Sequence, residues 1–305
     1  MSKTIRIGTR DSELALWQAH TVQKKLNDLG YKTEITAVKS QGDIILDKPL
    51  YELGITGIFT KTLAIAMLNG QVDIAVHSMK DVPTALPIGI VQAAVLERAN
   101  TLDILVHKGN LDFLNSTGTI ATGSLRRQAQ WLNKYPNHTV VDLRGNVNTR
   151  MQKLQDSDWN GAVFAAAGLE RINLKPENYI NLDWMVPAPA QGAMVVVAME
   201  NDDFCKDALA KLNHNETEIC THIEREFLKT LEGGCTAPIG ALATFASDKI
   251  DFEGVLFSLD GKEKHTIKKS CTFDSYKNFG KNCAEEILNN GGSALMESIR
   301  RDLKK

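Results

Sequence analysis

The sequence is poor in cysteine and has no long apolar run. Among its 305 residues there are five cysteines and no Cys-x-x-Cys pair, so neither a disulfide framework nor a thiolate zinc site is expected. No segment approaches the roughly 18 apolar residues of a membrane span, and the amino terminus, MSKTIRIGTR, lacks the apolar core of a signal peptide. We therefore expect a cytoplasmic protein with reduced thiols, no bound metal and no membrane partner.

The net charge of −2 gives no indication of a nucleic-acid partner, but the basic residues are unevenly distributed. The chain has 11 arginines and 24 lysines, whereas between Arg126 and Arg171 five arginines stand against two lysines. A guanidinium group pairs with a carboxylate or phosphate through two parallel hydrogen bonds, which an ammonium group cannot do. The stretch therefore favours recognition of planar anions. For any single arginine, the alternative is an exposed position on a helix, where an ion pair contributes little.

Strand-like and helix-like segments alternate through the first two thirds of the chain. Residues 4–8, 33–39 and 72–78 read as strands, and 12–30 and 60–70 read as helices, the first with Ser12 at its N-cap and Gly30 at its end. A second series of the same kind begins near residue 119, after a break between Glu97 and Leu102. The pattern predicts two similar α/β domains with mainly parallel sheets. After Gly240 three alternating segments and two helices predict a small α+β domain.

Polar side chains gather where the predicted strands end. In open α/β sheets, ligands bind beyond the carboxyl ends of the strands. Taken singly, each of these side chains has a simpler explanation as a helix cap or a polar loop residue. Together they predict a cleft lined by guanidinium groups and one carboxylate, suited to a large polyanion. The residues are Arg10, Ser12, His77, Ser78, Lys80, Asp81, Thr122, Ser124, Arg126, Arg127, Arg144 and Arg150.

Six motifs appear in an order and at spacings that resemble the porphobilinogen deaminase (hydroxymethylbilane synthase) family. The resemblance extends over almost the whole chain, and HSMKDVP and LEGGC are its most specific parts. The motifs are AVHSMKDVP (75–83), GSLRRQ (123–128), LRGNVNTR (143–150), AAGLER (166–171), APAQGAM (188–194) and LEGGC (231–235).

The resemblance implies a fold, an activity and a cofactor. The fold has two α/β domains like the halves of solute-binding proteins, 1–97 with about 193–213 and 101–187, and a C-terminal α+β domain, 216–305. The implied enzyme polymerises porphobilinogen into the linear tetrapyrrole hydroxymethylbilane, releases ammonia, and acts in haem biosynthesis. Its dipyrromethane cofactor is attached through a thioether to Cys235 and serves as primer. We expect a monomer with porphobilinogen as its small-molecule partner.

The family's site residues carry over to matching positions of this sequence. Asp81 is implied as the catalytic residue that stabilises cationic pyrrole intermediates. The implied cofactor-binding residues are Cys235, Lys80, Asp81, Thr122, Ser124, Arg126, Arg127, Arg144 and Arg150. The implied substrate-binding residues are Arg10, Ser12, Arg144, Arg150, Arg171 and Gln191.

Two alternatives and two departures accompany this interpretation. Considered in isolation, Cys235 reads as a small buried residue beside a helix cap. A solute-binding module would share the two α/β lobes but has no need of Cys235. A cysteine nucleophile would need a base, and the sequence does not place His77, His222 or His265 beside the thiol. Departures from the family pattern are Glu52 and Thr56, which replace two loop lysines, and Gly123, which replaces a hydroxyl residue.

Overall fold

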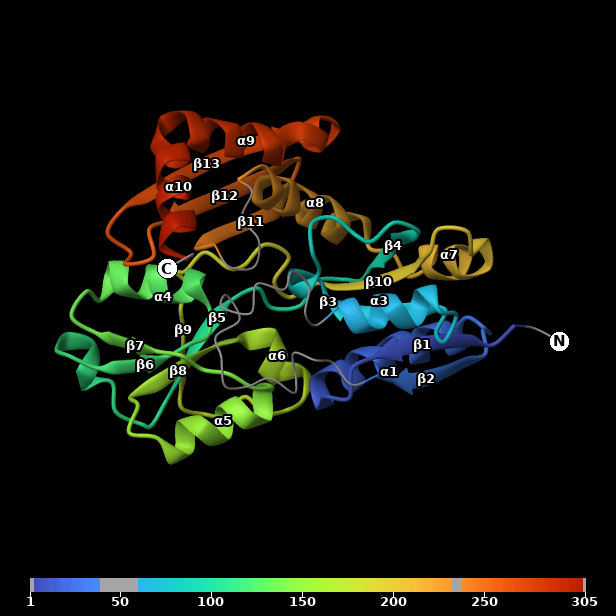
Figure 1. The fold of residues 1–305 in the computed structure, drawn as a ribbon, viewed down its shortest axis with the longest axis horizontal. Coiled ribbons are helices and arrows are strands. Elements are labelled where there is room, and N and C mark those ends of the chain that lie inside the picture. The colour runs from blue at the N-terminus through green and yellow to red at the C-terminus, as the bar shows by residue number, and fades with distance from the viewer. Residues whose placement is uncertain (1–2, 39–59, 232–236, 304–305) are drawn as a thin grey trace. The chain divides into compact units, whose positions relative to one another are not determined.

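The computed structural model describes residues 3–38, 60–231 and 237–303 (Figure 1). Contacts divide these residues into two units. The first unit contains 3–38, 60–99 and 192–218, and the second contains 100–191, 219–231 and 237–303. Because the second unit holds both the second and the third predicted domain, the division into three domains remains a prediction. No helix in the described ranges has the length and apolar character needed to cross a membrane.

The first unit is built on a five-stranded sheet in the order β2-β1-β3-β10-β4. The central strand pairs join segments that lie far apart in the sequence, since the fourth strand comes from beyond residue 190. The strands are β1 (Ile5–Thr9), β2 (Thr33–Ala37), β3 (Ile74–Ser78), β4 (Ile90–Val95) and β10 (Met194–Met199). β1 pairs parallel with β2 and β3, whereas β10 pairs antiparallel with both β3 and β4.

The second unit repeats this arrangement with other strands, in the order β7-β6-β8-β5-β9. The strands are β5 (Asp103–His107), β6 (Thr119–Ala121), β7 (Thr139–Val141), β8 (Gly161–Ala165) and β9 (Tyr179–Asn181). β6 pairs parallel with β7 and β8, and β5 pairs antiparallel with β8 and β9. The prediction of two similar α/β sheets is confirmed. Four of the five strands in each sheet run in one direction, as the mainly parallel pattern predicts, while β10 in the first sheet and β5 in the second run against both neighbours.

Helices cover both faces of each five-stranded sheet (Figure 1). In the first unit, α1 (Glu13–Asp28) and α7 (Asp203–Ala210) pack on the face that carries Ile5, Ile7 and Val76, and α3 (Lys61–Leu68) lies on the opposite face. In the second unit, α4 (Leu125–Lys134) buries Trp131 on one face. α5 (Val147–Asp156) and α6 (Ala166–Arg171) bury Leu154 and Leu169 on the other. Each sheet has two covered faces because successive side chains along a strand point to opposite sides of the sheet.

The second unit also contains the predicted antiparallel meander, β11 (Ile239–Ala246), β12 (Lys249–Phe257) and β13 (Lys264–Thr272). One face of this sheet is covered by α8 (Asn215–Thr230), α9 (Phe279–Ile287) and α10 (Ser293–Asp302). Phe227 of α8 lies directly over Gly254, where a Cβ would approach the ring to 2.6 Å, so a glycine is needed for this packing. The other face contacts α4 through Val255, Phe257 and Ala129.

A buried carboxylate fastens the segment 188–191 to this meander. Glu224 of α8 has no exposed surface, and it accepts hydrogen bonds from the backbone N–H groups of Ala190, at 2.6 Å, and Ala243, at 2.8 Å. Ala190 has a φ of 62°, which is unfavourable for a residue with a side chain. The carboxylate therefore holds a strained backbone at the end of the second unit's α/β part.

Replacing Glu224 by alanine should destabilise the second unit. The change removes the acceptor of two backbone donors, and each buried donor left without an acceptor costs about 1–3 kcal/mol. Glu226, two residues further along the same helix, is partly exposed and pairs with Lys229 at 3.4 Å, so Glu226→Ala is the matched control. Urea unfolding of the two variants measures the difference. Equal unfolding midpoints would contradict the role given to Glu224.

Candidate functional site

The turn after β3 carries Lys80 and Asp81 and is fixed at both ends. Met79 is buried, and its N–H donates to the carbonyl of Ala193 at 3.0 Å. Val82 is also buried, and its N–H closes the turn on the Met79 carbonyl at 3.1 Å. Lys80 and Asp81 stand between these two anchors and are both partly exposed. The sequence HSMKDVP thus produces a rigid support for one ammonium group and one carboxylate.

A third restraint on this turn comes from α1. Gln18 is 2 % exposed, and its Nε2 donates to Ser78 Oγ at 2.8 Å. The sequence analysis treated the segment around Gln18 only as part of a helix. The sequence feature that could have identified this role is a glutamine among the apolar positions of an amphipathic helix, because a buried amide needs a hydrogen-bond partner. Gln18 therefore links the first helix to the start of the turn that holds Asp81.

Arg10 and Ser12 lie at the same edge of the first sheet as this turn. β1 and β3 pair parallel, so the residues that follow each strand end at one edge. Ser12 caps α1, where its hydroxyl accepts a hydrogen bond from Ala15 N–H at 3.4 Å. The N-cap prediction for Ser12 is confirmed, and its role in binding substrate stays a prediction. Arg10 lies near enough to His77 to lower the pKa of that imidazole, in addition to the larger effect of burial.

In the second unit, three of the predicted arginines lie on the segments that follow the parallel strands β7 and β8. These strands run parallel, and Arg144, Arg150 and Arg171 follow β7, the β7–α5 loop and β8 respectively. Burial lowers the pKa of Arg144, an effect that Asp142 opposes, and burial lowers the pKa of Arg171 to about 10, opposed by Glu170. Guanidinium groups removed from water in this way are strong donors to a carboxylate.

Hydroxyl groups border the same edge. Thr122 is 3 % exposed and its N–H donates to the carbonyl of Val141 at 2.9 Å. Ser124 is the N-cap of α4 and accepts from Arg127 N–H at 3.5 Å. At Gly123, between them, a Cβ would come within 2.6 Å of the Leu143 carbonyl oxygen. The backbone therefore excludes the hydroxyl residue that the family pattern has at this position, unless the 143 segment shifts.

Arg126 and Arg127 are placed differently from the other arginines. Both are buried, and both pair with Asp103, Arg126 Nη1 with Oδ2 at 2.6 Å and Arg127 Nη2 with Oδ1 at 2.8 Å. Arg126 Nη1 also donates to the Val186 carbonyl, and Arg127 Nη1 donates to the Val163 carbonyl. These contacts point to a structural role, and direct cofactor binding by the two residues stays a prediction.

Asp103 itself was missed by the sequence analysis. It has no exposed surface and also accepts from Gln191 Nε2 at 3.0 Å, while the same nitrogen donates to the Thr101 carbonyl. The amide of Gln191 is thus engaged in this cluster, and its predicted substrate contact remains untested. Asp103 could have been identified from its position directly before the apolar run ILV, because an aspartate there is expected to be buried and a buried carboxylate needs cationic partners.

The donors in these ranges fit a cofactor that carries carboxylate arms. The segments that follow β6, β7 and β8 offer hydroxyl and guanidinium donors. Nε and Nη1 of Arg144, and Nε of Arg126, are buried without a hydrogen-bond acceptor, although both side chains make other interactions. Cys235, the predicted attachment point, and Glu52 and Thr56 lie outside the described residues. No three His, Cys, Asp or Glu side chains are grouped as metal ligands in the described part of the chain.

Two family models match the sequence. The dipyrromethane cofactor-binding domain of porphobilinogen deaminase matches residues 5–207, and the C-terminal domain of porphobilinogen deaminase matches residues 218–289. The chain belongs to the porphobilinogen deaminase family. Porphobilinogen deaminase of Desulfitobacterium hafniense is 40 % identical over 309 residues, covering 99 % of each chain. The Campylobacter fetus protein is 40 % identical over 96 % of this chain and 97 % of its own.

The relatives include a plant protein, the chloroplastic porphobilinogen deaminase of Oryza sativa, 40 % identical over 97 % of this chain and 86 % of its own. Among solved structures, the periplasmic VFT2 domain of Bordetella pertussis BvgS overlaps 68 % of this chain and 86 % of its own with a TM-score of 0.42 and 13 % identity. The resemblance stated from the sequence motifs is confirmed by the family match. So is the dipyrromethane cofactor, because the N-terminal family model is that of its binding domain.

Proposed function

We propose that Asp81 is the catalytic carboxylate of a porphobilinogen deaminase and that Cys235 holds its dipyrromethane. As a member of the family, the enzyme joins porphobilinogen units head to tail into the linear tetrapyrrole hydroxymethylbilane and releases ammonia. The observation that carries the residue assignment is the anchored turn of HSMKDVP, which presents one carboxylate beside one ammonium group at the carboxyl end of β3. We further infer that the enzyme acts as a monomer in the cytoplasm.

Asp81 would act on the charge that develops in the substrate. Loss of ammonia from porphobilinogen leaves a cation delocalised over the pyrrole ring and its nitrogen. A fixed carboxylate that accepts a hydrogen bond from the pyrrole N–H stabilises this cation. It can also accept a proton that the reaction releases. Met79 and Val82 keep the carboxylate in position, and Lys80 beside it suits a carboxylate arm of the substrate. The dipyrromethane, when bound, supplies the free pyrrole carbon to which units are added.

The arginines would have two different roles in binding. Arg144, Arg150 and Arg171 would hold carboxylate arms at the edge of the second sheet, and Arg10 would do so in the first unit. Each charge-assisted hydrogen bond contributes about 1.5–3 kcal/mol, so several of them can retain a growing chain of acidic rings between additions. Arg126 and Arg127 would support this edge from inside through Asp103. Thr122 and Ser124 add hydroxyl donors.

Intact mass spectrometry tests the proposed attachment. The purified chain should be heavier than its 33.6 kDa sequence mass by two pyrrole units, because the thioether survives denaturation. Cys235→Ser should remove the whole increment, whereas Cys271→Ser, at a partly buried thiol in β13, should leave it unchanged. An unmodified parent chain that still forms acid-oxidisable tetrapyrrole from porphobilinogen would contradict the assignment of Cys235.

A further inference from the structure

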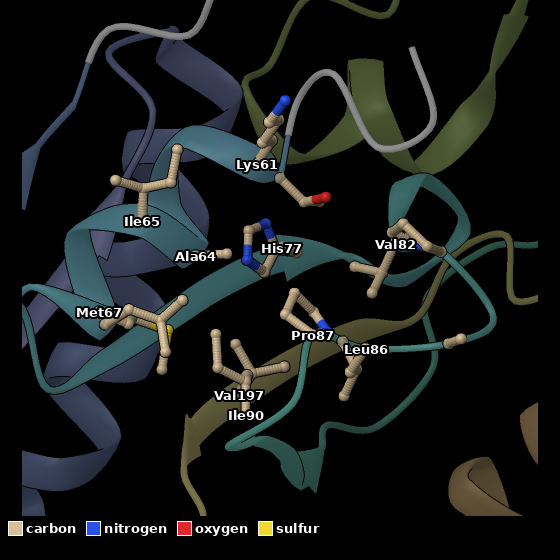
Figure 2. A pocket seen from close by; sticks show the side chains of 14 residues that line it. Lys61, Ala64, Ile65, Met67, His77, Val82, Leu86, Pro87, Ile90 and Val197 are labelled. Carbon is tan, nitrogen blue, oxygen red and sulfur yellow. The ribbon is translucent and has the colours of Figure 1, made fainter.

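A cavity of about 410 Å³ lies in the first unit, on the face of the sheet opposite α1 (Figure 2). Its walls come from α3, from the segment that follows Asp81, and from the strands β4 and β10. Val76 and Val196 belong to the core beneath α1, so their neighbours His77 and Val197 project to the other face and line the cavity. Ala64, Met67 and Leu86 are among the side chains that close it.

The cavity is large enough for a small molecule of one or two rings. An internal cavity of about 150 Å³ is sufficient for benzene, and ligand pockets typically begin at about 300 Å³. The side chains that line it are nearly all aliphatic or proline. Lys61 stands at the rim, and its ammonium group points away from His77 (Figure 2). Apart from Lys61 at the rim, the described residues that line the cavity carry no cation to neutralise the carboxylates of porphobilinogen or of its products, which distinguishes this cavity from the arginine-rich edge of the second unit.

His77 is the polar side chain that projects from the sheet into the cavity, whereas Thr60 and Lys61 line it at the start of α3. His77 is 8 % exposed, and its ring is directed into the space between α3 and the 82–87 segment (Figure 2). Burial, and to a lesser extent the nearby Arg10, lowers its pKa to about 4. The neutral ring presents one donor and one acceptor, and a polar group of a ligand in the cavity can pair with either of them.

We propose that this cavity is a binding site for a neutral, largely apolar ring compound that carries a single hydrogen-bonding group, which pairs with His77. The aliphatic walls contribute affinity through burial of the ring, and the imidazole fixes its orientation. The site goes beyond the proposed deaminase function and does not depend on it, because none of the groups assigned to carboxylate binding line it.

Pairs of isosteric probes test the role of His77. Indole and quinoline carry a donor and an acceptor nitrogen respectively, and indene and naphthalene are their apolar counterparts. Binding is followed by titration of the methyl NMR signals of Val82, Leu86 and Val197 in the full-length enzyme. Either indole should bind about 2–10-fold more tightly than indene, or quinoline more tightly than naphthalene by the same factor, as one hydrogen bond provides. The preference should disappear in His77→Leu.

Two variants of α3 test the cavity itself. Ala64→Leu adds a larger side chain inside the cavity and should weaken probe binding about tenfold, because overpacking of a defined space is unfavourable. Thr62→Leu places the same leucine side chain on the same helix outside the cavity and should leave binding unchanged. The absence of saturable shifts, a preference that survives His77→Leu, or equal weakening by both α3 variants would overturn the proposal. The α3 pair remains informative if His77→Leu fails to fold.

Discussion

Replacing Asp81 by alanine should lower the turnover of porphobilinogen by about 10²–10³-fold, the loss expected when one fixed group that stabilises transition-state charge is removed. The side chain stands on a turn whose flanking residues are buried and hydrogen-bonded, so its removal should leave the turn in place. The effect should therefore fall on kcat more than on KM. Initial rates of hydroxymethylbilane formation, followed as porphyrin after acid oxidation, measure both constants.

The controls for this experiment come from the same edge of the sheet. Asp11 is an exposed carboxylate two residues beyond β1, and Asp11→Ala should retain at least about half of the activity, because an exposed charge interacts weakly through water. The mass of the Asp81 variant should show that its cofactor remains attached. Full-speed polymerisation by such cofactor-bearing material would exclude Asp81 as the catalytic carboxylate. A loss of similar size in Asp11→Ala would show that the rate depends on the total negative charge at this edge of the sheet and not on Asp81 specifically.

The sequence predicts much of the carboxyl edge of each sheet, because strand ends are visible in it. Buried strands read as short apolar runs, and the polar residues directly after them must lie at one edge when the strands run parallel. Asp81 after β3 and Arg144 after β7 are both placed in this way by the structure. The N-cap of α1 follows equally from local chemistry, since Ser12 accepts the hydrogen bond of its own helix.

The residue pattern alone does not reveal which segments pair over long distances, and only the family resemblance places 193–213 with the first domain. β10 enters the first sheet between β3 and β4 from about a hundred residues further along the chain, and its apolar run carries no mark of its partners or direction. The pairing of Arg126 and Arg127 with Asp103 cannot be read from the sequence for the same reason. They sit in a motif that suggests anion binding, but β5 brings Asp103 beneath them by antiparallel pairing with β8, and the carboxylate takes up both guanidinium groups.

Asp103→Asn should accordingly be among the most destabilising single changes in the second unit. The carboxylate has no exposed surface, and it is 2.6 Å from Arg126 and 2.8 Å from Arg127. Breaking a buried ion pair from one side leaves uncompensated charge and typically costs about 3–5 kcal/mol. Here two guanidinium groups would lose their counter-ion, while the amide could still accept a hydrogen bond. A fall in melting temperature on the order of 10 °C is expected for a unit of this size.

Glu170→Gln is the matched control, because it makes the same change at an ion pair nearer the surface of the same unit. Glu170 accepts from Lys175 at 2.9 Å and its side chain is 34 % exposed, so its loss should cost less than about 1 kcal/mol. Thermal unfolding followed by circular dichroism compares the two variants. If both variants lower the melting temperature equally, Asp103 does not stabilise the second unit more than a surface ion pair does. Arg126 and Arg127 would then again be candidates for direct binding of the cofactor's carboxylates. If only Asp103→Asn unfolds early, the two arginines act on the site from within the core.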